Sequence, residues 1–476
     1  MKFLYQPLND RSPQPAVFDE NIIYSFKYLQ QQSDTFSAWL ARLDLLPNSC
    51  VASLLPNSAL AAAVFLAIAR SGHCFLPLNT GLKPPELDSL LQRCAVQAVF
   101  CNSRTRAGVR GVPVLDVQAD DPATAAGVAT TPFDKSLDPR RDFVCLSTSG
   151  STGEPKVIVR RAEAAEANLR QLASALQISP ADRFLSVVPF SHGHGLTNGL
   201  MLPLACGASL VTHPQFLPRQ VAASIVELGV TVVVGSPFIY QALARVIHPG
   251  SNLGDVRAWI SSGAALPEAL DNRLRNLGIA VRQIYGTTEA GSISISSGER
   301  GGSGYIGRPL PHATVRVVDS EGKNVPDGVD GIIEVASTGF FKGYVGGASL
   351  AQLLTPDGYY RPGDMGRFEP DGGLRLTGRS DRMINVAGVK VDPIEVQAVI
   401  QALPGIVQAL VLGRLDESGL ESVHALLVAE SGLSAADVLR HCRGVLADYK
   451  LPRRIEFVEE IPQDLMGKSA QPLLNQ

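Results

Sequence analysis

The chain of 476 residues contains no long run of apolar residues. Its longest, residues 59–69, is too short to cross a bilayer and is typical of a buried helix. The first residues, Met1–Pro7, lack the apolar core of a secretory signal. The seven cysteines include no Cys-x-x-Cys pair, and such a scattered, odd set is typical of reduced thiols. These absences predict a cytoplasmic protein without a membrane span.

Charged residues are also few, at 18% of the chain, and the net charge is −3 with no long basic tract. Proteins that bind nucleic acid neutralise its phosphates with many lysines and arginines, so nucleic acid is not expected as a partner. Hydrophobic residues make up 45%, enough for substantial cores. Because 476 residues exceed what one core usually organises, at least two domains are predicted.

A Walker A loop, G-x-x-x-x-G-K-[ST], is missing as well. The closest match, Gly467–Ser469, has Pro462 where the first glycine is required. Residues 146–156, LSTSGSTGEPK, instead combine hydroxyls, glycines and Lys156 between two apolar runs. Freed backbone N–H groups, hydroxyl donors and a cation together suit a polyphosphate, and a plain Ser/Gly surface turn is the alternative.

From residue 142 onward, short β-rich runs alternate with helical patterns. The expected strands include 183–188, 209–211, 230–234, 256–260 and 281–285, and the expected helices include 196–205, 220–228, 238–246 and 267–277. This alternation predicts an α/β fold with doubly wound, mostly parallel sheets. Strand-like pieces between Asp-Gly turns at 300–380 predict a small β-barrel or sheet, and residues 381–476 read as a small α+β domain.

The run at 146–156 resembles the phosphate-binding signature of the acyl-adenylate-forming superfamily, which includes acyl- and aryl-CoA synthetases, adenylation domains of peptide synthetases and luciferases. Further signatures of that superfamily follow in the expected order: Tyr285–Glu289 (YGTTE), Gly363-Asp364, Gly378–Asp381 with Gly388 downstream, and Gly467-Lys468. The resemblance covers roughly residues 140–470. It implies a large N-terminal domain, 1–380, and a small mobile C-terminal domain, 381–476.

The resemblance implies a two-step reaction. A carboxylic acid attacks the α-phosphorus of ATP, which leaves an acyl-adenylate and pyrophosphate, and the acyl group then passes to a pantetheine thiol. Opposing anions must be brought together, so such a site needs a metal and fixed donors. The residues implied at the β- and γ-phosphates are Thr148, Ser149, Gly150, Ser151, Thr152, Gly153 and Lys156.

The Tyr285–Glu289 motif is implied to hold the nucleotide and the metal. By resemblance, Tyr285 lies against adenine, Gly286 belongs to the same nucleotide site, Thr287 or Thr288 contacts the α-phosphate, and Glu289 binds Mg²⁺. A hard cation with phosphate ligands needs only one or two protein carboxylates, so one glutamate suffices. Because the motif follows a strand, it is expected at the carboxyl end of the sheet. The alternative is a tight turn with a capping hydroxyl.

Two further motifs are implied at adenine and ribose. Gly263 and Ala264 match a small-residue run along the adenine edge, where small side chains let backbone approach a flat base. Asp364 resembles the aspartate that accepts both ribose hydroxyls, and Arg379 is implied as a further ribose contact. An exposed turn aspartate and a surface arginine are the alternatives.

The C-terminal motifs are implied to move. Asp381 matches the hinge, where few residues absorb a large backbone rotation. Gly388 is implied to leave room for a pantetheine arm, since a glycine has no side chain. Lys468 matches the lysine that reaches the α-phosphate and the carboxylate during adenylation.

The acid and the thiol are less defined. Pro189–Gly195 resembles the CoA-ligase form of a family signature, with His192 at the carboxylate end of the pocket. A packed loop residue is the alternative for His194. No aspartate lies between Asp182 and Glu227 to pair with a substrate ammonium, which disfavours an amino acid and favours an aliphatic or aromatic acid.

The acceptor thiol stays open between CoA and the phosphopantetheine of an acyl carrier protein. The chain is expected to act as a monomer or a homodimer. A kinase-like ATPase that releases ADP is disfavoured, because Walker A and kinase motifs are absent. A non-catalytic relative that binds nucleotide or acyl groups is the alternative outside enzymes. A pyrophosphate-exchange assay separates such a binding protein from a ligase.

Overall fold

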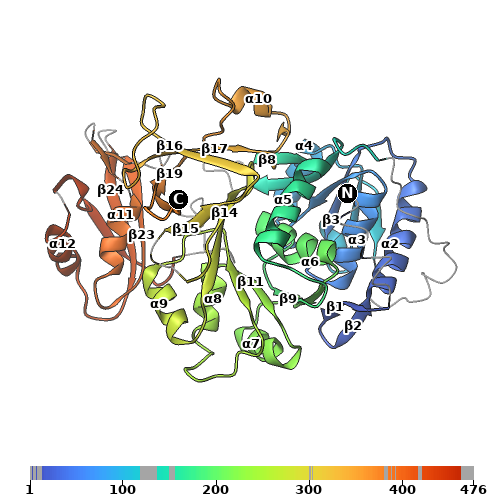
Figure 1. Ribbon diagram of the computed structural model, residues 1–476, viewed down its shortest axis with the longest axis horizontal. Helices are drawn as coiled ribbons and strands as arrows, with labels where there is room; N and C mark the ends of the chain where they lie inside the picture. The colour runs from blue at the N-terminus through green and yellow to red at the C-terminus, as the bar shows by residue number, and fades with distance from the viewer. Residues whose placement is uncertain are drawn as a thin grey trace. The chain divides into compact units, whose positions relative to one another are not determined.

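The computed structural model describes most of the chain, namely residues 3, 7, 13–117, 137–148, 156–299, 302, 304–379, 384–386, 389–391, 393–415, 421–446 and 448–461. It divides into two compact units: Met1–Val315 with Val335–Tyr360, and Arg316–Glu334 with Arg361–Gln476. The predicted domain boundary at 380 and 381 lies outside the described residues and stays a prediction. Figure 1 labels the elements of both units.

One sheet of the first unit has the strand order β15-β14-β13-β12-β11-β9-β10-β1-β2. Its strands are β1 (Pro15–Asp19), β2 (Ile22–Ser25), β9 (Arg183–Ser186), β10 (Ser209–Thr212), β11 (Val232–Gly235), β12 (Ala258–Ser261), β13 (Val281–Thr287), β14 (Gly291–Ile295) and β15 (Tyr305–Pro309). Strands β1, β10, β9, β11, β12 and β13 run parallel, whereas β2, β14 and β15 pair antiparallel. The carboxyl ends of the parallel strands therefore share one edge.

Helices connect these parallel strands, as Figure 1 shows for α7 and α8 near β11. The connecting helices are α6 (Leu202–Cys206), α7 (Pro218–Glu227), α8 (Pro237–Leu243) and α9 (Glu268–Asn276), and α5 (Ala162–Ala175) leads from β8 of the other sheet into β9. The core strands are rich in β-branched residues, and Val232, Val233 and Val234 of β11 are fully buried. Such continuous apolar runs are typical of strands covered on both faces.

The second sheet of the first unit has the order β18-β8-β7-β4-β3-β5-β6. Its strands are β3 (Cys50–Leu54), β4 (Cys74–Pro77), β5 (Ala98–Cys101), β6 (Val114–Asp116), β7 (Asp142–Thr148), β8 (Lys156–Arg161) and β18 (Gly343–Tyr344). Nearby helices are α2 (Phe26–Ala41), α3 (Ala59–Arg70) and α4 (Pro84–Arg93), with the short α10 (Leu350–Leu353) after β18. The apolar run 59–69 is the buried helix α3, as predicted. Within the described residues, no helix is long and apolar enough to cross a membrane.

The second unit contains strands β16 (Ala313–Val318), β17 (Gly331–Ser337), β19 (Asp364–Phe368) and β20 (Leu374–Arg379), although the first parts of β16 and the last parts of β17 belong to the first unit. They follow one another in the order β16-β17-β19-β20. The region predicted as a small barrel or sheet therefore contributes these four strands to one sheet.

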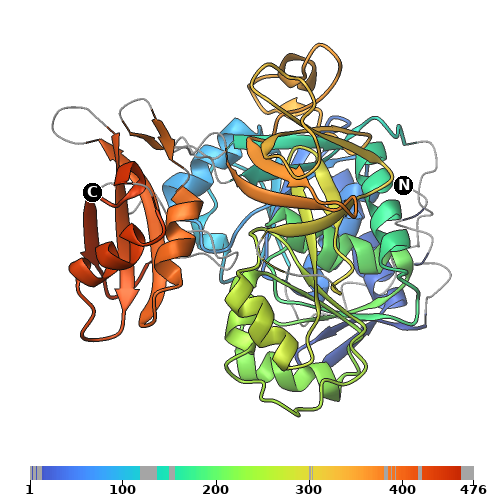
Figure 2. The same cartoon turned by 60° about the vertical axis from the view of Figure 1, so that its left-hand side comes forward.

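The rest of the second unit is a small α+β layer. Its elements are β21 (Ile384–Val386), β22 (Val389–Val391), α11 (Pro393–Gln401), β23 (Ile406–Leu415), β24 (Glu421–Ala429), α12 (Ala435–Arg443) and β25 (Arg454–Phe457). Figure 2 shows this layer in orange and red, with α11 packed beside β23. Val396, Val411 and Val438 contribute to its own apolar core. The predicted α/β fold class with a separate C-terminal α+β piece is confirmed.

The predicted helix at 196–205 differs from the structure in one respect. Its first part, Gly195–Met201, is a π-helix, and only Leu202–Cys206 is an α-helix. Two glycines in this turn lie against strand β9 and the chain that follows it. A β-carbon on Gly195 would lie 2.1 Å from the carbonyl oxygen of Pro189, and one on Gly199 would lie 2.3 Å from Ser186 Oγ. Such π-turns are frequent at functional sites.

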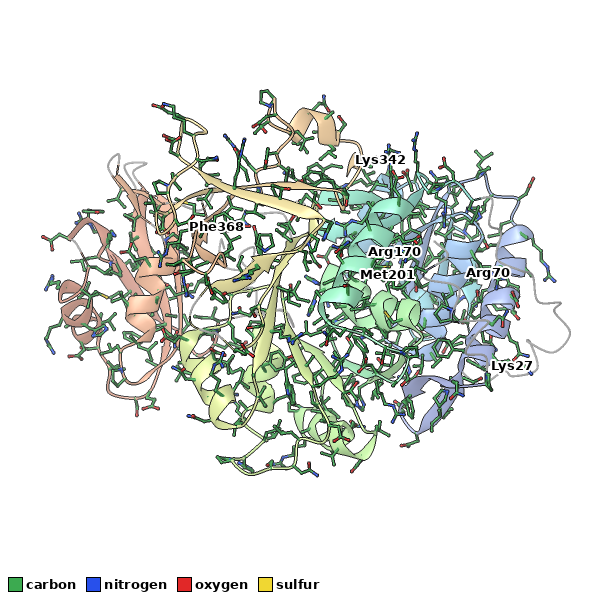
Figure 3. All side chains as sticks on the ribbon, in the orientation of Figure 1. Lys27, Arg70, Arg170, Met201, Lys342 and Phe368 are labelled. Atoms are coloured by element: carbon green, nitrogen blue, oxygen red, sulfur yellow. The ribbon has the colours of Figure 1, made fainter. Side chains whose placement is uncertain are left out.

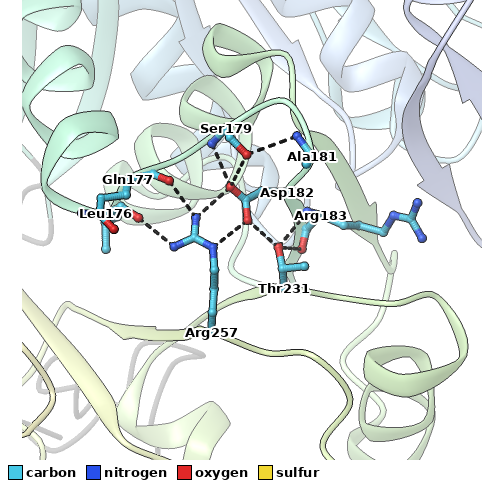
Figure 4. Close-up of polar contacts among 8 residues, drawn as sticks. All are labelled: Leu176, Gln177, Ser179, Ala181, Asp182, Arg183, Thr231 and Arg257. Carbon is cyan, nitrogen blue, oxygen red and sulfur yellow. Dashed lines mark hydrogen bonds and ion pairs between the residues drawn. The ribbon is translucent and has the colours of Figure 1, made fainter.

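A buried carboxylate ties together the chain segments at the amino ends of β9 and β11. Arg257 contacts both oxygens of Asp182, at 2.8 and 2.7 Å, and its guanidinium also donates to the carbonyl of Leu176 (Figure 4). Ser179 N and Thr231 Oγ1 donate to the same carboxylate at 2.8 Å. Burial alone would raise the pKa of Asp182, but these hydrogen bonds outweigh it and lower the pKa.

We expect Asp182→Ala to destabilise the first unit by about 2 kcal/mol, because it leaves the half-buried donors Ser179 N and Thr231 Oγ1 and the partly exposed Arg257 guanidinium without their shared acceptor. Arg170→Ala is the matched control: Arg170 (Figure 3) pairs with Glu166 one turn away on α5, is half-exposed, and should cost about 0.5 kcal/mol or less. Both tryptophans, Trp39 and Trp259, belong to the first unit, so fluorescence during urea unfolding measures its stability. Equal midpoints for the two variants would contradict the prediction.

Candidate active site

The carboxyl edge of the first sheet gathers several sequence motifs. Residues 187–195 follow β9, Ser262–Ala265 follow β12, and Thr287 ends β13 with Thr288 and Glu289 directly after it. Strands β9, β11, β12 and β13 run parallel to one another. Open α/β sheets bind ligands at this edge. The prediction that the Tyr285–Glu289 motif reaches the carboxyl end of the sheet is confirmed in its placement, while the roles of its residues stay predictions.

The Tyr285–Glu289 motif is closely packed against strand β14. Tyr285 is buried, whereas Gly286 is exposed. A β-carbon on Gly286 would lie 2.3 Å from the carbonyl oxygen of Gly291, so only glycine fits there. Thr287 Oγ1 accepts a hydrogen bond from Ala290 N at 3.0 Å, which is the capping contact considered as the alternative. The hydroxyl hydrogen of Thr287 is not used in that bond and still has a donor role available.

Residues 341–344 bind Glu289 at its side chain and at its backbone carbonyl. Tyr344 Oη donates to Glu289 Oε1 at 2.8 Å, and Phe341 N donates to the carbonyl of Glu289 at 2.7 Å. Burial and the nearby Glu289 charge raise the pKa of Tyr344, so its hydroxyl stays protonated and donates. Glu289 itself is half-buried, and among the described residues only Tyr344 donates to its carboxylate. A half-exposed carboxylate with an oxygen to spare fits Mg²⁺.

Arg160 of β8 supports the same motif and was missed by the sequence analysis. Its Nη2 donates to the carbonyl of Thr288 at 2.5 Å. Burial lowers its pKa to about 10, while the charge of Glu289 opposes that shift. The guanidinium therefore remains charged at neutral pH and fixes the backbone between Thr288 and Glu289. The sequence feature that could have pointed to Arg160 is its place directly after the β-branched run Val157–Val159, where a charged residue is unusual.

The predicted phosphate loop connects two paired strands. Thr148 ends β7, Lys156 begins β8, and the two are partners in the antiparallel register. Lys156 is exposed, with its Nζ 5.4 Å from the centre of the Tyr344 ring. Lys156, Tyr344 and Glu289 are thus linked by successive contacts. The predicted phosphate residues Ser149, Gly150, Ser151, Thr152 and Gly153 lie outside the described residues.

Gly263 and Ala264 are exposed directly after β12. Gly263 has φ +95°, a left-handed conformation that favours glycine. The next turn is anchored, since Leu266 N donates to Gln283 Oε1 of β13 at 2.9 Å. This exposed, side-chain-poor backbone is compatible with a flat base, the role predicted for it.

The two histidines after β9 have different surroundings. His192 is half-buried, and its Nδ1 accepts from His194 N at 3.3 Å. His194 is buried: its Nε2 contacts the Gly235 carbonyl and its Nδ1 contacts the Asn198 amide, each at 2.9 Å. The carbonyl requires a donor, so Nε2 carries the proton. Burial lowers the pKa of His194 to about 4, and the ring is neutral. His194 is thus a packed loop residue, which is the alternative that the sequence offered for it.

This burial predicts a pH dependence of stability. The pKa of His194 is about 4 in the folded protein against an ordinary 6.5. The neutral ring therefore makes its full contribution to the free energy of unfolding above pH 6.5, and this contribution is lost as pH falls toward 4. The shift corresponds to about 3 kcal/mol. We expect the free energy of unfolding of wild type to fall more steeply across this window than that of His194→Gln. Other buried histidines contribute equally to both proteins, and parallel curves would contradict the prediction.

Asp364 and Arg379 belong to the second unit and lie opposite each other on β19 and β20. Asp364 is buried, and Arg379 Nη1 contacts its Oδ1 at 3.0 Å, while Arg379 Nη2 donates to the Pro362 carbonyl at 3.3 Å. Arg379 therefore orients the aspartate that was predicted to bind ribose. The predicted catalytic Lys468, hinge Asp381 and pantetheine-side Gly388 lie outside the described residues.

Comparison with known proteins agrees with this arrangement. The sequence profile described as "AMP-binding enzyme" matches residues 6–345, and "AMP-binding enzyme C-terminal domain" matches residues 395–468. The chain is 31% identical over 443 residues to an indoleacetate–CoA ligase of Aromatoleum aromaticum, covering 88% of this chain and 86% of that protein. It is 29% identical to a fatty acid–[acyl-carrier-protein] ligase of Streptomyces coeruleorubidus, covering 95% and 91%.

Among solved structures, ATP-bound MatB from Rhodopseudomonas palustris is similar, with a TM-score of 0.90 and 26% identity over 99% of this chain and 98% of that one. The family profile covers well over half of the chain, and the strands, the motif placement and the relatives agree. The chain therefore belongs to the AMP-binding enzyme family, as an AMP-forming acid–thiol ligase.

Proposed function

We propose that this ligase activates an aliphatic or aromatic carboxylic acid as its acyl-adenylate and transfers the acyl group to the thiol of CoA. The observation that carries the proposal is the carboxyl edge of the first sheet, where the exposed backbone of Gly263 and Ala264 follows β12 and the half-buried Glu289, held by Tyr344, follows the neighbouring strand β13. A carboxylate for Mg²⁺ and a flat backbone surface for adenine are what adenylation requires.

The acid is proposed to lack an ammonium group. Asp182 is the aspartate nearest in sequence to the 189–195 signature, and it is saturated by Arg257, Ser179 and Thr231 at the amino end of β9. It lies at the opposite end of its strand from the ligand edge. His194 is neutral and bonded at both ring nitrogens, so it offers no charge either. A neutral, mostly apolar acyl group fits these surroundings.

The residues have distinct proposed roles. Thr287 and Thr288 donate from the end of β13 to the α-phosphate, and Lys156 neutralises the β- and γ-phosphates. Glu289 holds Mg²⁺, which supplies charge neutralisation on the phosphates when bound. Tyr344 and Arg160 orient Glu289 and its backbone, so that the carboxylate needs little reorganisation when it binds the metal.

CoA is the proposed thiol, because the indoleacetate relative is a CoA ligase and matches the chain along most of its length. An acyl carrier protein is the second candidate, since the Streptomyces relative uses one. Both acceptors present the same phosphopantetheine thiol.

A two-stage assay tests the proposal. Acid-dependent exchange of pyrophosphate into ATP is measured with aryl, fatty and amino acids, and active acids are then offered CoA or a carrier protein. Exchange with aryl or fatty acids and thioester formation with CoA are expected. Exchange with amino acids alone would overturn the acid class, and thioester formation only with the carrier protein would overturn the acceptor. Absence of exchange with every acid would overturn adenylation itself.

A further inference from the structure

Four cysteines of the first unit gather at the opposite end of the second sheet from the predicted phosphate loop. Cys50 and Cys74 begin the parallel strands β3 and β4 and are register partners, and Cys145 lies in the middle of β7. Cys94 caps the end of α4. The phosphate loop instead follows the far end of β7, after Thr148. The roles proposed above use none of these thiols.

The thiols line a cavity that reaches the surface. The cavity has a volume of about 570 Å³, and its wall runs from the exposed Leu46 and Asn48 to the four sulfur-bearing side chains. Lys342, labelled in Figure 3, and Asp142 also line it and form an ion pair at 2.9 Å. A small molecule entering this cavity therefore meets thiols and a paired charge.

Cys145 is the member of the cluster that contacts the other thiols. Cys74 Sγ and Cys145 Sγ are 3.4 Å apart. Hydrogen bonds from the Cys50 and Cys74 thiols lower the pKa of Cys145, and Lys342 lowers it further against burial and Asp142. The same contacts raise the pKa values of Cys50 and Cys74. One thiolate with a protonated thiol in contact is the arrangement of an attacking and a resolving cysteine.

We propose that Cys145 and Cys74 form a thiol–disulfide exchange site for a low-molecular-weight disulfide. Cys145 Sγ attacks one sulfur of the disulfide, a mixed disulfide forms, and one thiolate leaves. Cys74 then gives its proton to that thiolate and attacks Cys145 Sγ, which expels the second thiolate. The net reaction converts two protein thiols and one external disulfide into a Cys74–Cys145 disulfide and two external thiols.

Strand geometry makes this bridge reversible. Phe75 and Val144 are register partners on β4 and β7, so Cys74 and Cys145 share one face at diagonal positions. Their Sγ atoms are 3.4 Å apart, longer than the roughly 2.05 Å of an S–S bond, so closing the bridge requires the two side chains to move together. A bridge that departs from relaxed geometry is more readily reduced.

The test treats the folded protein with oxidised glutathione. The protein is then denatured, its remaining thiols are alkylated, and its intact mass is measured. Wild type should lose two of its seven alkylatable thiols without gaining mass from glutathione, and mild dithiothreitol before denaturation should restore them. Cys145→Ser should keep all its remaining thiols. Cys74→Ser should stop at the mixed disulfide and retain one glutathione at Cys145.

Cys442→Ser is the matched control, because Cys442 is buried in the second unit and should not affect the bridge. Circular dichroism checks that each variant is folded, and Cys145→Ala serves if Cys145→Ser is not. Retention of all seven thiols in wild type would overturn the proposal, as would peptide mapping that finds Cys145 bonded to Cys50. Neither readout depends on the ligase reaction.

Discussion

Glu289→Gln is expected to slow acid-dependent pyrophosphate exchange by about 10²–10³, the scale for losing one preorganised electrostatic group. Glutamine keeps the size of the side chain and an oxygen that accepts from Tyr344, so the local fold should be preserved. It removes the negative charge that the proposed Mg²⁺ contact requires. The loss is therefore assigned to metal binding rather than to packing.

Tyr344→Phe is the matched control for this prediction. It removes the hydrogen bond to Glu289 Oε1 but leaves the carboxylate, so about a tenfold loss is expected from poorer positioning. Binding of Mn²⁺, followed by electron paramagnetic resonance, gives a readout that is independent of turnover. Glu289→Gln should weaken Mn²⁺ binding in the presence of ATP more than Tyr344→Phe does. An exchange rate for Glu289→Gln equal to wild type would contradict the metal assignment.

The support of Glu289 could not be predicted from the sequence, because its partners are distant along the chain. Tyr344 lies 55 residues from Glu289, and Arg160 lies 128 residues from Thr288. Local patterns carry no information on which distant side chain meets a turn. The strands β11, β12 and β13 were predicted within a few residues, because each is a short apolar run between turn residues.

The roles of hydroxyl and histidine side chains were also only partly predictable. The sequence allowed both a phosphate contact and a capping contact for Thr287, and the structure shows the cap with Ala290. His194 could be placed in a packed loop, but its neutral state follows from Gly235 and Asn198, whose positions only the fold supplies. The π-helix at Gly195–Met201 likewise follows from its close approach to β9, which is a tertiary contact.

Lys468→Ala is expected to slow adenylation by at least about 10²–10³ and to spare thioester formation from supplied acyl-adenylate. Lys468 lies outside the described residues, so the prediction depends on the resemblance of Gly467-Lys468 to the family's catalytic lysine. A lysine that meets the α-phosphate only during adenylation contributes only to that half-reaction. Pyrophosphate exchange and single-turnover thioester formation measure the two halves separately.

Lys450→Ala is the control that makes the result specific. Lys450 is another lysine of the C-terminal region, and its Nζ is paired with Glu395 at 2.6 and 2.7 Å, so it has a structural partner of its own. Its loss should leave pyrophosphate exchange unchanged. If Lys468→Ala slowed both half-reactions equally, the lysine would act on the fold or on nucleotide affinity rather than on one chemical step. If both lysine variants matched wild type in exchange, adenylation would depend on cations elsewhere, with Lys156 the first candidate.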